Sequence, residues 1–108
     1  DLREDLLWAM DEWEGWLATH SPWSRRLQTL VVLSYCRMLQ SLETGTVTSK
    51  REAGKWALRA LDPEWNGLVR AALDDRADPR RKVREQADAA LVARTREFMA
   101  YAAGLARA

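Results

Sequence analysis

The sequence predicts an all-α fold, a five-helix antiparallel bundle formed as a single domain over residues 1–108. Apolar residues recur every three or four positions along most of the chain, which is the period of an amphipathic helix. The β-branched run Thr46–Thr48 is too short to build a sheet. Capping residues and prolines divide the chain into five periodic segments with short connections, as expected of a bundle.

The first helix is expected over Asp1–Thr19, where leucine, methionine and tryptophan side chains form one apolar stripe. Ser21-Pro22 ends it, because a residue before proline avoids the helical region. The central helix is expected over Ser24–Glu43. It is apolar over most of its circumference, so we expect neighbours to bury it on several sides. Gly45 can take the left-handed conformation that closes a helix.

The remaining helices are marked by their caps. Ser49 and Glu52 form a capping box, so a third helix begins between them. Asp62-Pro63 places a cap before a proline and starts a fourth helix. Asp78-Pro79 repeats this arrangement, so we expect a fifth helix from there, with an apolar stripe that includes Val83 and continues to Leu105.

The composition excludes several classes of protein. The formal net charge of +1 gives no overall attraction to nucleic acid or to an acidic membrane, and no apolar run is long enough to span a bilayer. The single cysteine, Cys36, lies in the central apolar helix and is read as a small buried hydrophobe. A chain without an internal disulfide fits a reducing compartment, so a cytoplasmic location is expected.

No catalytic constellation is complete in this sequence. There is no glycine-rich phosphate loop. His20 and Cys36 are too few for a histidine–cysteine metal site, and His20 has no evident partner for nucleophilic catalysis. We therefore expect neither a catalytic residue nor a metal ligand in this chain.

The segment Leu27–Leu61 carries an arginine in mid-helix, then Thr-Gly, a short β-branched link, Ser-Lys and an alanine-rich helix with Trp-Ala. In this chain these residues are Arg37, Thr44-Gly45, Val47, Ser49-Lys50 and Trp56-Ala57. The series resembles the C-terminal helical domain of streptomycin/spectinomycin (aminoglycoside 3''-) adenylyltransferases. The resemblance extends from about Asp5 to Gly104.

The resemblance implies an antibiotic-resistance type of enzyme that transfers AMP from ATP to a small-molecule hydroxyl, with an aminoglycoside among the candidate acceptors. In the family, the Mg²⁺-binding carboxylates and the general base lie in an N-terminal nucleotidyltransferase domain, which is absent from this sequence. ATP and Mg²⁺ would thus be cofactors of the full-length enzyme, and this chain alone is expected to hold neither and to be inactive. The helical domain would close the cleft and contribute binding residues.

Site residues follow from the same resemblance. Lys50 matches a lysine that contacts the nucleotide phosphates, and it lies at a helix N-terminus, which favours anions; the alternative is a solvated surface lysine. Arg76 stands where the family has a tyrosine against the nucleotide, and an arginine could approach phosphate instead. For the acceptor, Trp16 is the nearest counterpart of the family's drug-binding tryptophan, and Trp13 or Trp23 is the alternative if the alignment contains a gap of one or two residues.

One departure from the family concerns charge. The family's acidic drug-binding positions fall around Trp23 to Leu27, and no Asp or Glu occurs between Glu14 and Glu43. Aminoglycosides are polycations that carboxylates normally hold. Either the missing domain supplies the acidic groups or the substrate is not streptomycin.

Two other functions remain open on the sequence alone. Trp8, Trp13, Trp16 and Trp23 are together too many for one small bundle to bury completely, so the tryptophan-rich first helix could pair with a second copy or with another protein. Trp56 and Trp65 are expected in the core. Nucleic-acid binding through the basic segment Arg76–Arg84 is the weakest reading, since the total charge is nearly neutral.

Overall fold

The computed structural model describes residues 1–78 and 85–108; the predictions for Val83 and for most of the basic segment Arg76–Arg84 therefore lie outside the described residues. Within them the chain forms α-helices and one short 3-10 helix and no strand, which confirms the all-α prediction. The elements are α1 (Leu2–Ala18), α2 (Arg25–Thr44), α3 (Lys50–Ala60), η1 (Pro63–Trp65), α4 (Asn66–Ala77) and α5 (Ala89–Arg107).

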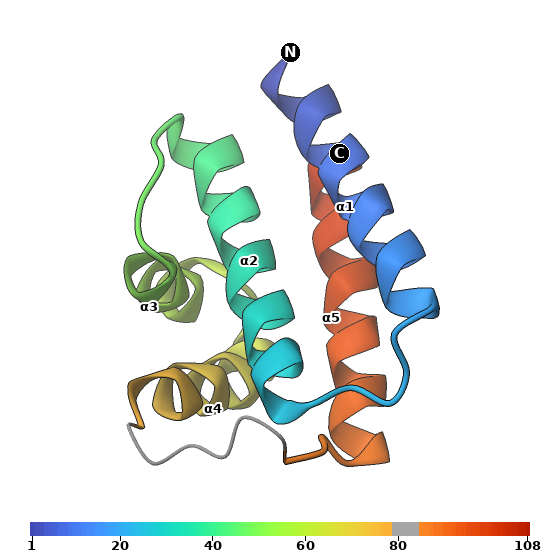
Figure 1. Cartoon of the computed structure of the whole chain (residues 1–108). Helices are drawn as coiled ribbons and strands as arrows, with labels where there is room; N and C mark the ends of the chain where they lie inside the picture. Colours follow the sequence, from blue (N-terminus) through green and yellow to red (C-terminus); the bar gives the residue numbers. More distant parts are fainter. Residues whose placement is uncertain (79–84) are drawn as a thin grey trace.

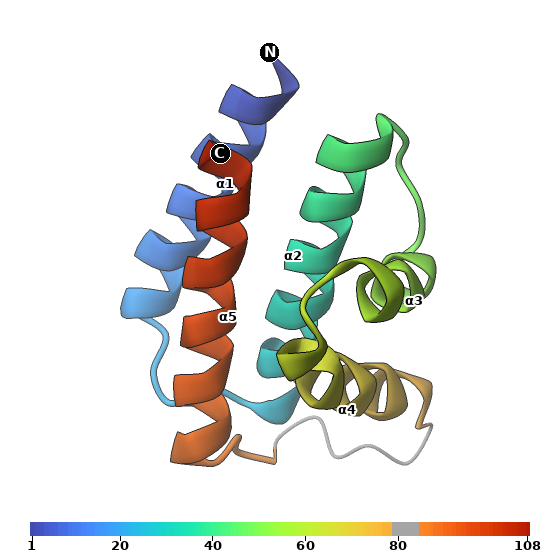
Figure 2. The same cartoon turned by 180° about the vertical axis from the view of Figure 1, so that it is seen from behind.

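The helices form two groups around α2. The long helices α1, α2 and α5 lie side by side, whereas α3 and α4 lie across α2 on its other side (Figures 1 and 2). Helix α1 runs opposite to α2 and α5, which run in the same direction (Figure 1). The antiparallel arrangement thus describes α1 against its neighbours and does not extend to all five helices. As predicted, α2 is central, because it contacts each of the other four α-helices.

The capping residues read from the sequence act as expected. The Ser24 hydroxyl accepts from the Leu27 N–H at 3.0 Å, and the Ser49 hydroxyl accepts from the Glu52 N–H at 3.1 Å. Each bond satisfies a backbone donor that the first turn of a helix leaves unpaired. Gly45 closes α2 with a φ of 73°, in the left-handed region that glycine adopts without a steric penalty. These caps fix where α2 and α3 begin and where α2 ends.

The predicted start of the fifth helix at Asp78-Pro79 is wrong. Asp78 instead closes α4, and α5 begins only at Ala89. The backbone before α5 is bonded to the segment that leads into α2: the Ala87 N–H donates to the Trp23 carbonyl at 3.0 Å, and the Arg25 N–H donates to the Glu85 carbonyl at 2.7 Å. Because these groups are paired with another segment, they cannot take part in a helical ladder.

The core is built from the inner faces of all five helices. Val31, Val32, Leu33 and Cys36 of α2 have no exposed surface. Burial on this scale is the main source of stability, at about 25 cal/mol per Å² of apolar surface. Trp65 is buried as predicted and packs on Phe98 and Tyr101, whereas Trp56 is half-buried. Gly54 in α3 allows a close approach, since a Cβ there would lie 2.6 Å from Leu73 of α4.

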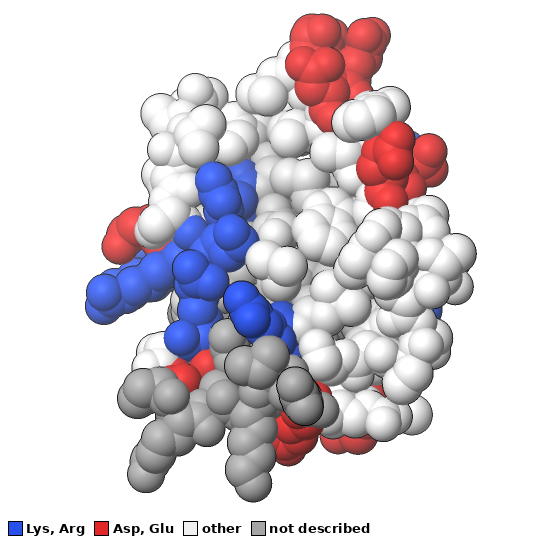
Figure 3. All heavy atoms as spheres, in the orientation of Figure 1, with Lys and Arg blue, Asp and Glu red and all other residues white. Residues whose placement is uncertain are grey.

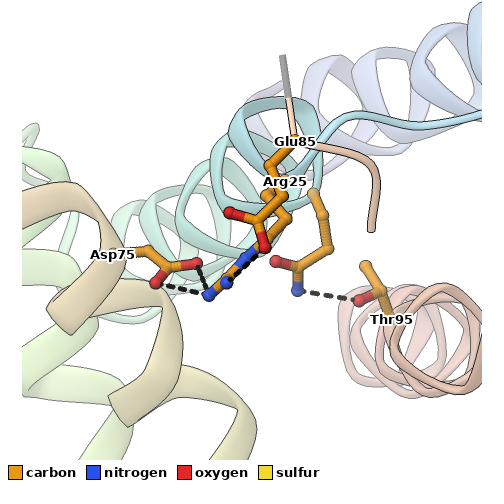
Figure 4. Close-up of polar contacts among 5 residues, drawn as sticks. Arg25, Asp75, Glu85 and Thr95 are labelled. Carbon is orange, nitrogen blue, oxygen red and sulfur yellow. Dashed lines mark hydrogen bonds and ion pairs between the residues drawn. The ribbon is translucent and has the colours of Figure 1, made fainter. Parts of the chain in front are cut away.

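A polar network fixes the start of α2 to the rest of the domain (Figure 4). Arg25 Nη2 donates to both carboxylate oxygens of Asp75 in α4, at 2.7 and 2.6 Å, and Nη1 donates to Glu85 at 3.4 Å. The hydrogen bond to Asp75 is the main reason that the pKa of Arg25 is raised. Deeper in the core, Gln28 Nε2 donates to the Thr95 hydroxyl of α5 at 3.0 Å. Helices α4 and α5 are thereby set around α2.

Candidate functional site: a basic cluster beside an aromatic groove

Three cations from three helices converge at the start of α3. Lys50 is the first residue of α3, Arg37 lies in the middle of α2, and Arg76 lies in the last turn of α4. The pKa of Lys50 is lowered from 10.5, chiefly by desolvation and then by the positive charges of Arg37 and Arg76. Both guanidinium groups therefore lie within the range of electrostatic interaction with the Lys50 amine. We refer to Arg37, Lys50 and Arg76 as the basic cluster.

The surface around the basic cluster is strongly positive. Figure 3 shows Lys and Arg side chains gathered over the region where α2, α3 and α4 meet. A hollow of about 550 Å³ continues the cluster between α3 and α4. It is lined by Arg51, Lys55, Leu73, Asp74, Arg76 and Ala77. The N-terminal dipole of α3 adds to the same positive potential, although Glu52 in its first turn offsets part of it.

A second hollow, of about 540 Å³, lies between α1 and α2 and is almost entirely apolar. We call it the aromatic groove. Its lining residues are Trp8, Ala9, Glu12, Trp13, Trp16, Leu27 and Leu30. Trp8 is 67% exposed and Trp16 is 46% exposed, which is unusual for such large apolar side chains. A contiguous apolar surface of this kind normally marks a binding site or an interface.

Two tryptophans of the aromatic groove make ring contacts. The rings of Trp13 and Trp16 meet edge to face, with centroids 6.1 Å apart. His20 stacks on Trp16 with a centroid distance of 3.6 Å, and its Nδ1 lies 2.6 Å from the Trp16 carbonyl oxygen. His20 therefore supports the groove through Trp16.

A separate, smaller hollow of about 230 Å³ adjoins the aromatic groove. Its lining residues are Trp13, Ser34, Arg37, Met38, Ser41 and Val47. Trp13 also lines the aromatic groove, and Arg37 also belongs to the basic cluster. One residue of each surface thus borders this hollow.

The residues singled out in the sequence are distributed unevenly over this surface. Lys50 and Arg76 are close to each other, and Trp16 and Trp13 line the aromatic groove. Trp23 does not, because it is only 2% exposed, and Arg96 of α5 lies over its ring at 4.9 Å from the centroid. Its backbone bond to the segment before α5 holds it in the core, so its ring is not available at the groove.

Two contributors were not singled out as site residues from the sequence. Arg37 is an arginine in an otherwise apolar helix, which is a signal that could have been weighted more heavily. Trp8 departs from the main stripe of its helix, and the structure shows it at the mouth of the aromatic groove. Only the packing of α1 against α2 brings it there.

The described residues contain no group of three or more His, Cys, Asp or Glu side chains that could hold a metal ion. Burial raises the pKa of the Cys36 thiol to about 12, so it is not a nucleophile at neutral pH. None of the described helices is both long and apolar enough to cross a membrane.

The fold and its surface define a helical domain with a basic cluster and an apolar groove. The sequence model of the aminoglycoside adenylyltransferase C-terminal domain family matches residues 1–102. The chain therefore belongs to this family, which confirms the resemblance seen in the sequence. No curated protein and no solved structure matches the chain.

Proposed function

We propose that this domain forms one wall of the active-site cleft of an aminoglycoside-adenylyltransferase-like enzyme. That enzyme would transfer AMP from ATP to a hydroxyl group of a small molecule. A nucleotidyltransferase domain on the opposite side of the cleft would hold Mg²⁺ and the general base. The observation that carries the proposal is the convergence of Arg37, Lys50 and Arg76 in a domain of this family. Such an enzyme would work in the cytoplasm, where ATP is available.

The role of the basic cluster follows from the chemistry of the transfer. The acceptor oxygen forms a bond to the α-phosphorus while the bond to the bridging oxygen breaks, and pyrophosphate leaves with the electron pair. The hydroxyl proton passes to a carboxylate of the nucleotidyltransferase domain. Negative charge increases on the leaving pyrophosphate, so cations held in advance near the β- and γ-phosphates stabilise the transition state. The cluster would supply such cations: Arg37 and Arg76 both lower the pKa of Lys50, and an anion bound beside the lysine would relieve this repulsion.

The proposal is tested by joining the domain to a nucleotidyltransferase domain, titrating Mg-ATP into the joined protein and following the backbone amide signals of α3 by NMR. Lys50→Met should weaken ATP binding about tenfold, which corresponds to one charge-assisted hydrogen bond. Arg107→Ala is the matched control, because it removes a cation from the exposed end of α5. Equal ATP affinity in the joined protein and in its Lys50→Met variant would refute the role of Lys50.

A second measurement tests the transfer itself. When the domain is joined to a nucleotidyltransferase domain, Arg76→Gln and Lys50→Met should lower kcat/KM for AMP transfer, and Arg107→Ala should leave it unchanged. Pyrophosphate release reports the reaction without requiring the acceptor to be identified in advance. An enzyme in which all three variants react like the parent would show that the basic cluster takes no part in catalysis.

The exposed indole rings favour one other function, a module that pairs with a second copy or with another protein through α1. Trp8 is 67% exposed and lines an apolar groove, as an interface residue would. This alternative expects a stable oligomer that dissociates in Trp8→Ala, and no response to ATP. Sedimentation of the chain at micromolar concentration distinguishes the two functions.

A further inference from the structure

We infer that the hollow between α3 and α4 is a product site, which takes up pyrophosphate after AMP has been transferred, and that Arg51 and Lys55 bind the ion there. The inference rests on the proposed function, because it assumes that the β- and γ-phosphates of ATP lie at the basic cluster before the transfer. It gives a role to two cations that lie outside that cluster.

The hollow between α3 and α4 has a size and a lining that suit a small anion. Its volume of about 550 Å³ lies within the range of small-molecule sites. Arg51 and Lys55 reach it from α3, and Arg76 reaches it from α4. Asp74 is the one carboxylate that the described residues place in its lining. Cations thus face the hollow from both of the helices that enclose it.

The side chains of Arg51, Lys55 and Arg76 are exposed and unpaired. No ion pair joins any of the three to a carboxylate within residues 1–78 and 85–108. Arg51 and Lys55 lie one helical turn apart on the same face of α3, where two like charges repel each other. An anion bound between them would relieve this repulsion and would replace no existing ion pair among the described residues.

Arg76 belongs to the hollow and to the basic cluster. It lines the hollow, and its charge also lowers the pKa of Lys50, so it lies within electrostatic range of the cluster. Lys50 and Arg51 are adjacent at the start of α3. Figure 3 shows Lys and Arg side chains gathered over this part of the surface. An anion that moved from the cluster into the hollow would therefore remain beside cations along its way.

The transfer reaction itself gives pyrophosphate a reason to move. As the acceptor oxygen bonds to the α-phosphorus, the bridging oxygen keeps the electron pair of the bond that breaks. The diphosphate group then carries one more negative charge than it did within ATP, and it is no longer tethered to the nucleotide. Additional ionised donors bind it more strongly for the first reason and become reachable for the second. ATP remains tethered through its α-phosphate and gains less from Arg51 and Lys55.

Asp74 limits how tightly the hollow holds an anion. Its exposed carboxylate lies in the same lining as the three cations and repels a phosphate group that they attract. Release of product limits the turnover of many enzymes, so a product site must not bind too tightly. Weak binding beside the basic cluster would clear the position of the β- and γ-phosphates for the next ATP.

Calorimetric titrations with inorganic pyrophosphate and with ATP, both in the presence of Mg²⁺, test the inference in the domain joined to a nucleotidyltransferase domain. Arg51→Gln and Lys55→Gln should each weaken pyrophosphate binding about fivefold and change ATP affinity by less than about twofold. Both side chains are exposed, so neither change should unfold the domain. The matched control is Arg59→Gln, which removes an exposed cation of α3 one turn beyond Lys55 and outside the lining of the hollow; it should change neither affinity.

Three results would overturn the inference. Unchanged pyrophosphate affinity in both Arg51→Gln and Lys55→Gln would show that the ion does not use the hollow. Equal losses of pyrophosphate and ATP affinity in these variants would show that the hollow belongs to the ATP site and does not distinguish the product. A loss of pyrophosphate affinity in Arg59→Gln as large as theirs would show that the cations of α3 act only through their overall positive potential.

The ATP titration of Lys50→Met keeps this test separate from that of the proposed function. If Lys50→Met weakens ATP binding while Arg51→Gln and Lys55→Gln bind pyrophosphate like the parent, the proposed function stands and the product site is wrong. If ATP binding is independent of Lys50 while pyrophosphate binding depends on Arg51 and Lys55, the proposed role of the basic cluster fails. The hollow is then an anion site without a part in the transfer, and the inference fails with it.

Discussion

The close approach of α3 to α4 makes a strong prediction about glycine. Gly54 and Gly15 both lie within helices, and neither has a positive φ. Replacing a helical glycine by alanine stabilises a helix by about 1 kcal/mol when the new methyl group meets nothing. At Gly15 nothing lies within 4 Å of the new Cβ. Gly15→Ala should therefore raise the free energy of unfolding by about 1 kcal/mol.

Gly54→Ala has the same helical gain and an added steric cost. The new Cβ would lie 2.6 Å from Leu73 Cδ2, 3.0 Å from Leu73 Cγ and 3.2 Å from Leu33 Cδ2. Carbon atoms prefer separations of about 3.5–4.0 Å, so both leucines must move. Leu73 is half-buried and can yield, but Leu33 is fully buried. Overpacking of this kind costs about 1–3 kcal/mol. The net change should lie between zero and a loss of about 2 kcal/mol.

Urea unfolding followed by circular dichroism at the helical band measures both variants. A gap of at least about 1 kcal/mol should separate them, or roughly 4–8 °C in Tm for a domain of this size. The double variant Gly54→Ala, Leu73→Ala removes the nearest clash, so the penalty of the added methyl group should shrink in that background. Equal stabilisation by Gly15→Ala and Gly54→Ala would refute the account of how α3 packs against α4.

Three further predictions concern buried or repelled groups. Thr95→Val should lower the free energy of unfolding by about 1–3 kcal/mol, because it leaves the buried Gln28 amide without its acceptor. Thr29→Val should be neutral or stabilising, because the Thr29 hydroxyl is buried and has no hydrogen-bond partner among the described residues. Urea unfolding of both variants measures the difference. Cys36 should react with a thiol reagent at pH 8 only as fast as the domain opens, because burial keeps its pKa near 12; a labelling rate that does not rise with urea would contradict this. Lys50→Met should stabilise the ligand-free domain, because the variant removes a charge that is desolvated and that the neighbouring arginines repel. This stabilisation should decrease with added salt, which screens the repulsion. Calorimetry in low and high salt measures the change in Tm.

The sign of the Lys50 titration agrees with this prediction. Its pKa in the folded domain is lower than the ordinary 10.5, so the unfolded chain binds more protons between the two values. The contribution of Lys50 to the free energy of unfolding should consequently increase as the pH rises through the folded pKa toward 10.5. Below that window the charged amine opposes folding. A Lys50→Met variant should lack this component of the pH dependence.

The sequence predicted the parts of the fold that short-range chemistry determines. Ser24, Ser49 and Gly45 mark helix ends because each acts on groups within a few residues of itself. The start of α5 was missed because Glu85 and Ala87 are bonded to the segment before α2, more than fifty residues away. No local pattern encodes that pairing. The same long-range contact accompanies the burial of Trp23, which the resemblance had named as a possible counterpart of the family's drug-binding tryptophan.

The candidate site was predictable only in part for the same reason. The resemblance pointed to Lys50 and Arg76 as single positions, but their approach to each other depends on how α3 and α4 lie across α2. Arg37 joins them because the buried stripe of α2 fixes the direction in which its remaining side chains point. The aromatic groove depends on the packing of α1 against α2. Residue types could thus be read from the sequence, whereas their combination required the fold.

Two arginines of α2 show how differently the domain treats positive charge. Arg25 has carboxylate partners in Asp75 and Glu85, and its pKa is raised, so its charge contributes to stability. Arg37 is instead one of the charges that lower the pKa of Lys50, so its position works against the stability of the ligand-free domain. Like charges contributed by three separate helices agree with the anion-binding role proposed for the basic cluster, since an anion bound among them would recover the free energy that their repulsion costs the empty domain.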